Sequence, residues 1–205
     1  GPRKRPGTGK SSSRAATPDR PEAFERRRFG ASASSPAAAA HAQAVLRLLL
    51  AQGGSTTRLC EAIADAKLGL HVIEQRHCTD VPEPVRAALP GEALLERISC
   101  LASRGVVMLD SLAYIATRCL PRELAQEIEA GTQPIGHLLE RLWVRRALWP
   151  RAHPALCTRL WARVGCPDAS ASRTCTIATP DGPLMVITET FRDGMLRLQP
   201  ACDPE

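Results

Sequence analysis

Residues 94–117, LLERISCLASRGVVMLDSLAYIAT, decide the fold class of this chain. Residues 94–101 and 106–117 are two apolar runs of strand length, and Ser103-Arg104-Gly105 between them supplies turn residues. Strands joined by so short a turn pair antiparallel with each other. The stretch therefore predicts a β-hairpin within an antiparallel sheet.

Helices and further strands are expected on either side of this hairpin. The expected helices are 44–50, one that Ser55 begins, 121–130 and about 134–146, and the other expected strands are about 68–77, 157–165, 170–179 and 183–191. Pro180-Asp181-Gly182 separates the last two strands and is a second strong turn. From this order we predict an α+β domain in which helices pack on one face of an antiparallel sheet.

The positive charge of the chain lies in its N-terminal segment. Residues 1–40 carry nine Lys/Arg against three Asp/Glu, which is the whole formal net charge of +6, and residues 41–205 are balanced. Because residues 1–40 are also rich in Ser, Pro, Gly and Ala, we predict a disordered basic tail there, followed by one domain over 41–200. A solvated arm is the simplest interpretation of the tail, and weak polyanion binding or targeting are the alternatives. The domain itself is expected to bind no specific nucleic acid.

The chain also lacks the patterns of membrane and metal proteins. No apolar run approaches the ~20 residues that span a bilayer, and the first residues hold no signal-peptide core. The eight cysteines are scattered without a C-x-x-C pair, and the five histidines show no metal-ligand spacing. We therefore expect a cytoplasmic protein with reduced cysteines, no membrane partner, no metal and no cofactor.

Charged side chains fall on apolar faces of the expected strands. Alternation places Glu189 on one face of the last strand with three large apolar residues, and it places Arg97 among leucines. A carboxylate or guanidinium in such a place needs a partner of opposite charge, either on the protein or on a ligand. Arg76 and Arg173 raise the same question. The alternatives are a strand-end Glu189 that reaches solvent and arginines on the wet face of the sheet.

Two expected helix starts have the geometry of an anion site. Pro134 begins a helix, so the amides of Ile135 and Gly136 lie in its first turn without intrahelical partners. The sequence STTR at 55–58 begins another helix with the same potential. The alternative at both places is an ordinary helix start.

These stretches resemble the chorismate pyruvate-lyases, also called 4-hydroxybenzoate synthases. Residues 131–139, GTQPIGHLL, and residues 182–191, GPLMVITETF, are similar to the C-terminal signature of that family. Three upstream stretches follow the family's order as well, at 55–58, 94–98 and 110–115. The resemblance covers about residues 44–197.

The resemblance implies an antiparallel sheet with a buried site beneath two helix-turn flaps. It implies a carbon–oxygen lyase without cofactor or metal, which eliminates pyruvate from chorismate and leaves 4-hydroxybenzoate. Carried over by position, Arg97 would pair with the ring carboxylate, and the amides of Thr56 and Ile135 would contact the ligand. Glu189 would act at the opposite end as an acid, a base or an anchor. The implied catalytic residues are Glu189 and Arg97, and the implied substrate-binding residues are Thr56, Ile135, Gly136, Arg76 and Arg173.

Two other functions stay open at this point. The first is a paralogue with the same pocket that acts as a tailoring lyase, hydrolase or cyclase in natural-product biosynthesis. The second is a ligand-sensing domain, because domains of some transcription regulators share this fold. The partner that we expect is a small-molecule carboxylate substrate, and the paralogue would act on a different compound from chorismate.

Overall fold

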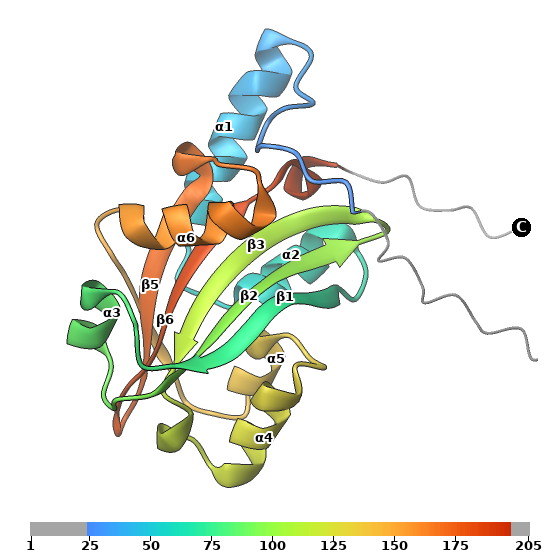
Figure 1. Cartoon of the computed structure of the whole chain (residues 1–205). Helices are drawn as coiled ribbons and strands as arrows, with labels where there is room; N and C mark the ends of the chain where they lie inside the picture. The colour runs from blue at the N-terminus through green and yellow to red at the C-terminus, as the bar shows by residue number, and fades with distance from the viewer. Residues whose placement is uncertain (1–23, 198–205) are drawn as a thin grey trace, which may run out of the picture.

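Residues 24–197 of the computed structural model are described here, and they form one six-stranded antiparallel sheet with helices against it (Figure 1). The strands are β1 Gly69–Cys78, β2 Leu94–Ser103, β3 Val106–Ile115, β4 Arg145–Leu148, β5 Ser172–Thr179 and β6 Gly182–Phe191. They lie in the order β1-β2-β3-β6-β5-β4, and every neighbouring pair is antiparallel. The predicted α+β class and antiparallel sheet are confirmed.

The helices begin and end at the residues that local chemistry favours. They are α1 Pro36–Ala51, α2 Thr56–Ala64, α3 Glu83–Ala88, α4 Arg122–Ala130, α5 Ile135–Leu139 and α6 Pro154–Val164, with 3₁₀ turns at Thr117–Cys119, Ala169–Ala171 and Asp193–Leu196. The side chains of Ser35 and Ser55 accept hydrogen bonds from the first turns of α1 and α2. Gly131 and Gly165 end α4 and α6 in the left-handed conformation that glycine adopts most easily.

The hairpin of β2 and β3 occupies the middle of the sheet. Arg104 and Gly105 make its turn with positive φ angles of 49° and 76°. Nine of the ten residues in each strand are buried. The stretch from which the fold class was predicted is therefore also the centre of the core.

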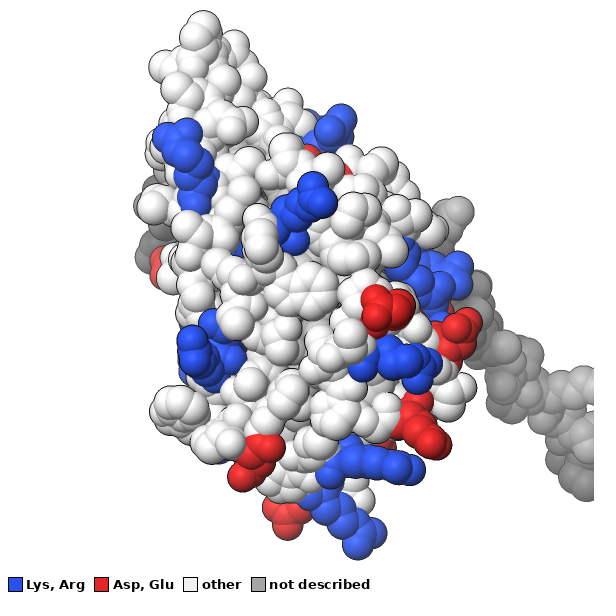
Figure 2. All heavy atoms as spheres, turned by 90° about the vertical axis from the view of Figure 1, so that its left-hand side faces the viewer, with Lys and Arg blue, Asp and Glu red and all other residues white. Residues whose placement is uncertain are grey.

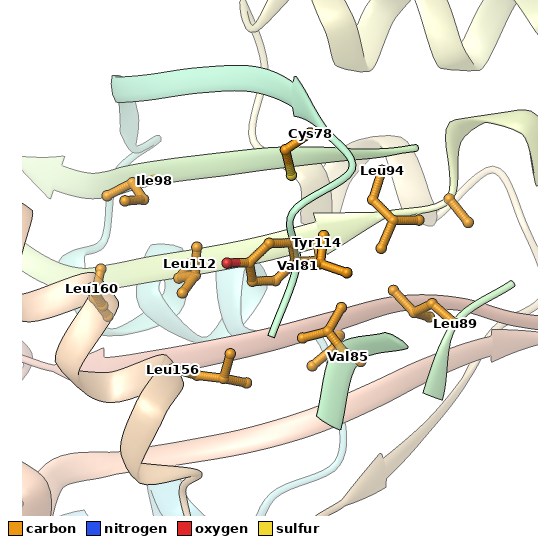
Figure 3. Packing of buried hydrophobic residues seen from close by; sticks show 12 residues of the cluster. Cys78, Val81, Val85, Leu89, Leu94, Ile98, Leu112, Tyr114, Leu156 and Leu160 are labelled. Atoms are coloured by element: carbon orange, nitrogen blue, oxygen red, sulfur yellow. The ribbon is translucent and has the colours of Figure 1, made fainter. Parts of the chain in front are cut away.

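Helices cover both faces of the sheet, which corrects the prediction that they pack on one. Leu156 and Leu160 of α6 and Val85 of α3 pack with Leu112 and Val186 on one face (Figure 3). The opposite face is covered by α4 and α5, and beyond them by α1 and α2. In Figure 1, α6 lies in front of the strands and α2 behind them.

The cause of this error is the segment 157–165, which we expected to be a strand, whereas residues 157–164 are helical in α6. Its apolar residues suit either a short strand or one buried helix face, and the buried Leu156 and Leu160 have the spacing of a helix. The helix expected over 134–146 is also too long, because α5 ends at Leu139 and the chain returns as β4. The short helix α3 was not predicted.

The segment before α1 belongs to the folded domain, so the boundary expected at residue 40 lies too late. Glu25 forms a β-bridge with Val106, and Arg26 Nε lies 3.0 Å from Asp110 Oδ2. Asp110 is completely buried and also pairs with Arg192 at 2.7 Å. Part of the basic segment is thus held by a buried acid. Residues 1–23 and 198–205, with the rest of the predicted tail and the expected domain end at 200, lie outside the described residues.

Candidate functional site

A cavity lies between the sheet face of β2, β3, β5 and β6 and the two helices α2 and α5. Its space is about 580 Å³, counted with the mouth that opens to solvent. The walls are mainly apolar, with Leu139 from α5 and with Leu101, Leu109, Ile177, Met185 and Ile187 from the strands. Because strand side chains alternate between the two faces, these strand residues all point the same way. The cavity therefore lies on the face of the sheet that carries Glu189.

The helices α2 and α5 form a joined roof over this cavity. A Cβ atom built on Gly136 would lie 2.7 Å from Thr57 Cβ, so the two helices meet where only glycine fits. Arg58 Nε donates to Glu140 Oε1 at 2.6 Å across the same junction. His137 Nε2 lies 3.0 Å from Glu61 Oε1. Thr56, Ile135 and Gly136, three of the expected binding residues, line the cavity beneath this junction.

Glu189 lies in the cavity wall, and its partner there is Arg173. Arg173 Nε donates to Glu189 Oε2 at 2.7 Å, and both side chains are buried. The guanidinium also donates to the carbonyls of Leu49 and Gln52 and to Thr56 Oγ1, at 2.6–2.8 Å. These bonds use four of its five N–H groups. Arg173 is therefore committed to the protein, where it joins β5, β6, α2 and the end of α1.

The pairing of Arg173 with Glu189 had a signal in the sequence. Both residues lie on the expected hairpin whose turn is Pro180-Asp181-Gly182, and the observed register places them opposite each other. Opposite charges directly across two strands attract each other. The turn alone sets a different register, because a bulge between Ile177 and Ala178 shifts the pairing by one residue before Arg173 is reached.

Arg97 lies outside the cavity lining. It is completely buried, its Nε donates to Gln75 Oε1 at 2.6 Å, and its Nη2 donates to the carbonyl of Ile128. Burial lowers the pKa of the Arg97 guanidinium to about 10. No ion pair to Arg97 occurs within residues 24–197, and its Nη1 has no hydrogen-bond partner there. The structure thus places Arg97, which the resemblance implied would bind the ring carboxylate, beside the end of α4 and next to the cavity.

Arg76, another of the expected binding residues, lies outside the lining of this cavity. Its Nε donates to Glu96 Oε1 at 3.0 Å. Glu96 belongs to the opposite face of β2, where it also accepts from Tyr114 Oη at 2.6 Å and from Arg159 Nε at 3.0 Å. These partners hold the pKa of Glu96 below its usual value even though burial opposes the shift. The cluster stabilises the packing of α6 on the sheet.

The cation that the sequence analysis missed is Arg146 on β4. It is half-buried and lines the cavity, whereas its neighbour Arg145 is exposed. Within the described part of the chain, Arg146 makes no hydrogen bond or ion pair. The segment was expected to be helical, so no strand face was assigned to it. Only the pairing of β4 with β5 turns Arg146 toward the cavity.

Hydroxyl groups make the floor of the cavity polar at one point. Ser99 Oγ and Ser111 Oγ lie 3.1 Å apart on the neighbouring strands β2 and β3. Ser111 is also directly opposite Glu189 on β6. A ligand in the cavity would therefore meet hydroxyl groups and a carboxylate at this place, and the guanidinium of Arg146 elsewhere on the wall.

Cys175 is a further wall residue, and a cysteine thiolate can act as a nucleophile. Burial, and the nearby Glu189 carboxylate, raise the pKa of its thiol to about 12. A thiol with so high a pKa stays protonated at neutral pH and is a poor nucleophile. The cavity is thus better suited to binding through charge and shape than to cysteine chemistry.

Residues 24–197 contain neither a metal-binding cluster nor a helix that could span a membrane. No group of three or more His, Cys, Asp or Glu side chains is placed to hold a metal ion. No helix is long and apolar enough to cross a membrane.

Comparisons with known proteins find similarity of overall structure only. No protein-family model matches the chain, and no curated protein matches it. PhnF from Mycobacterium smegmatis matches with a TM-score of 0.48 and 13% identity over 82% of this chain and 86% of that one. The effector domain of PhnF matches with a TM-score of 0.47 and 15% identity over 68% of this chain and 88% of that one.

A third solved structure is the C-terminal domain of the histidine utilization repressor from Pseudomonas syringae. It matches with a TM-score of 0.43 and 10% identity over 67% of this chain and 100% of that one. At these values the chemistry of the site rests on the residues of this chain alone. Membership of the chorismate pyruvate-lyase family stays a prediction, because no sequence comparison supports it.

Proposed function

We propose that this domain binds a small molecule that has one carboxylate on an apolar body, and that it acts as a ligand-sensing domain. The observation that carries the proposal is Arg146, a half-buried cation on the wall of an apolar cavity, without a hydrogen-bond or ion-pair partner in residues 24–197. A guanidinium partly removed from water gains most from a carboxylate that it can bind through two N–H groups. The cavity therefore favours an anionic ligand.

The charges of the lining favour one anionic group over two. The lining contains Arg146, Arg173 and Glu189 as its charged side chains. Arg173 and Glu189 neutralise each other at 2.7 Å, which leaves one net positive charge. Chorismate carries two carboxylates, so it is the less complementary ligand. An aromatic monocarboxylate such as 4-hydroxybenzoate would place its ring between the apolar walls and its hydroxyl group near Ser99 and Ser111.

Calorimetric titration with 4-hydroxybenzoate tests this proposal. Arg146→Gln is expected to weaken binding by at least about tenfold, because it removes the charge that the carboxylate would meet. Arg145→Gln is the matched control, since Arg145 is the exposed neighbour on the same strand and lies outside the cavity lining. Equal affinities of the two variants would contradict the proposal.

A cofactor-independent lyase is the second candidate, and one observation favours it. Glu189, Thr56, Ile135 and Gly136, which the resemblance to the chorismate lyases names, all line the same cavity. The test is incubation with chorismate while pyruvate and 4-hydroxybenzoate are followed by chromatography. Turnover in the parent protein and its loss in Glu189→Gln would replace the sensing proposal with an enzyme. Each variant must first be shown to be folded, because Glu189→Gln leaves the buried Arg173 without its counter-charge.

A further inference from the structure

We propose a second binding site, for a flat aromatic anion, in the groove between the start of α6, the loop after β4 and the end of α1. The groove has about 1060 Å³ of space, counted with its open mouth. Trp149, Pro150 and Trp161 are among its lining residues. Nothing in the function proposed above uses this groove. The start of α6 and the loop before it, which border the groove, lie on the left in Figure 1, the side that Figure 2 turns toward the viewer.

The two tryptophans of the groove are held in fixed orientations. Trp149 Nε1 donates to Thr176 Oγ1 at 2.9 Å, and Trp161 Nε1 donates to Thr190 Oγ1 at 3.1 Å. His153 also meets the ring of Trp149 edge to face, with centroids 5.9 Å apart. Because the polar atom of each indole is already bonded to the sheet, the rings offer only aromatic surface to an occupant. Rigid rings lose little conformational entropy on binding.

The charge of the groove favours an occupant of negative charge. Among residues 24–197, the charged side chains that line it are Arg151 and Arg173, and none of its lining residues is acidic. Arg151 is exposed and makes no hydrogen bond or ion pair with residues 24–197. The upper half of the face in Figure 2 carries mainly isolated basic groups on an uncharged background, while acidic groups gather toward its lower and right-hand edges. A ligand with a ring for the indoles and an anionic group for Arg151 is complementary to this lining.

Arg173 separates the groove from the first cavity, because it lines both. Its bonds to Glu189 and Thr56 belong to the first cavity, and its bonds to Leu49 and Gln52 hold the end of α1 beside the groove. The two sites therefore share one wall and differ in every other charged residue. This makes them separable by single substitutions.

Calorimetry with 2-naphthoate, a two-ring aromatic carboxylate, tests the second site. The titration is made first on Arg146→Gln, in which the charge of the first cavity is removed. Because 2-naphthoate can also enter the first cavity of the parent protein, affinities are compared within this background, where binding is expected to persist. Arg151→Gln, made in the same background, is expected to weaken it by about tenfold, whereas Arg145→Gln in that background leaves it unchanged. The neutral 2-naphthamide is expected to bind about tenfold more weakly than the acid.

A ring substitution provides the second arm of the test. Trp161→Leu is expected to abolish measurable binding, and Trp143→Leu is its control because Trp143 is 71% exposed and lies outside the groove. Since Trp161 also packs on the core, its variant is used only if its circular dichroism matches the parent. Arg151 is exposed, so Arg151→Gln tests the site whether or not Trp161→Leu folds. Loss of all naphthoate binding in Arg146→Gln, or equal affinity in Arg151→Gln and Arg145→Gln, would overturn the second site without affecting the first.

Discussion

At the scale of single residues, the cavity is defined by which charges already have partners. Arg173 and Arg146 both line it, yet Arg173 gives four N–H groups to the protein and Arg146 gives none within the described chain. Burying a charge pair costs solvation energy that good geometry recovers, and removing one partner leaves an uncompensated charge. Arg173 is therefore a structural residue of the wall, and Arg146 is the residue available to a ligand.

The thiols allow a direct test of how closed the cavity wall is. Cys175 is 2% exposed with a pKa raised to about 12 by burial, whereas Cys119 is exposed on the turn after β3. The thiolate is the reactive form, so at about pH 8 iodoacetamide should modify Cys119 and leave Cys175 unmodified. Mass spectrometry of the digested protein measures both. Modification of Cys175 at the rate of Cys119 would mean that the wall opens readily.

At the scale of elements, the roof of the cavity depends on the contact between α2 and α5. The contact is close because Gly136 faces Thr57, and Arg58 and Glu140 join the same two helices. The resemblance to the chorismate lyases predicted two helix starts over the site. The need for glycine at position 136 becomes clear only in the structure, where α2 approaches α5 at that residue.

Gly136→Ala tests this contact. The added methyl group would lie 2.7 Å from Thr57 Cβ, so α5 must shift away from α2. We expect the free energy of unfolding to fall by about 1–3 kcal/mol, the usual cost of overpacking, and 4-hydroxybenzoate binding to weaken. Gly53→Ala is the control, since a Cβ there meets nothing within 4 Å. Urea denaturation that shows the same change for both variants would contradict the proposed close contact.

At the scale of the whole molecule, one buried acid joins segments that lie far apart in the sequence. Asp110 on β3 pairs with Arg26 before α1 and with Arg192 after β6, at 3.0 and 2.7 Å. Asp168 and Asp193 also accept backbone hydrogen bonds from Phe29 and Ser32. These bonds attach the segment before α1 to the sheet, which composition alone could not indicate.

Asp110→Asn is expected to be strongly destabilising. It leaves the completely buried Arg192 without a counter-charge, which typically costs about 3–5 kcal/mol. The exposed Asp181 in the β5–β6 turn provides the control, because Asp181→Asn should change stability by less than about 0.5 kcal/mol. The measurement is the free energy of unfolding in urea. A loss below about 1 kcal/mol for Asp110→Asn would show that the network contributes little.

The sequence by itself determined what depends on neighbours along the chain. Turn residues indicated both hairpins, alternation placed Glu189 on one face of the last strand, and Ser55 and Gly131 marked a helix start and a helix end. The same local patterns failed over 157–165, because a short apolar run fits a strand or a buried helix face. Local patterns also predicted that α2 and α5 exist, but they did not predict that these two helices are in close contact.

Only the tertiary structure decided which of the charged side chains face the cavity. Arg97 and Arg76 were expected at the site, but Ile128 of α4 accepts from Arg97 and Glu96 on the other face of β2 pairs with Arg76. Arg146 was not expected there, and it reaches the cavity because β4 pairs with β5 at the edge of the sheet. The physical reason is that a buried charge needs compensating partners. Those partners come from segments that are distant in the sequence, so no local pattern identifies them.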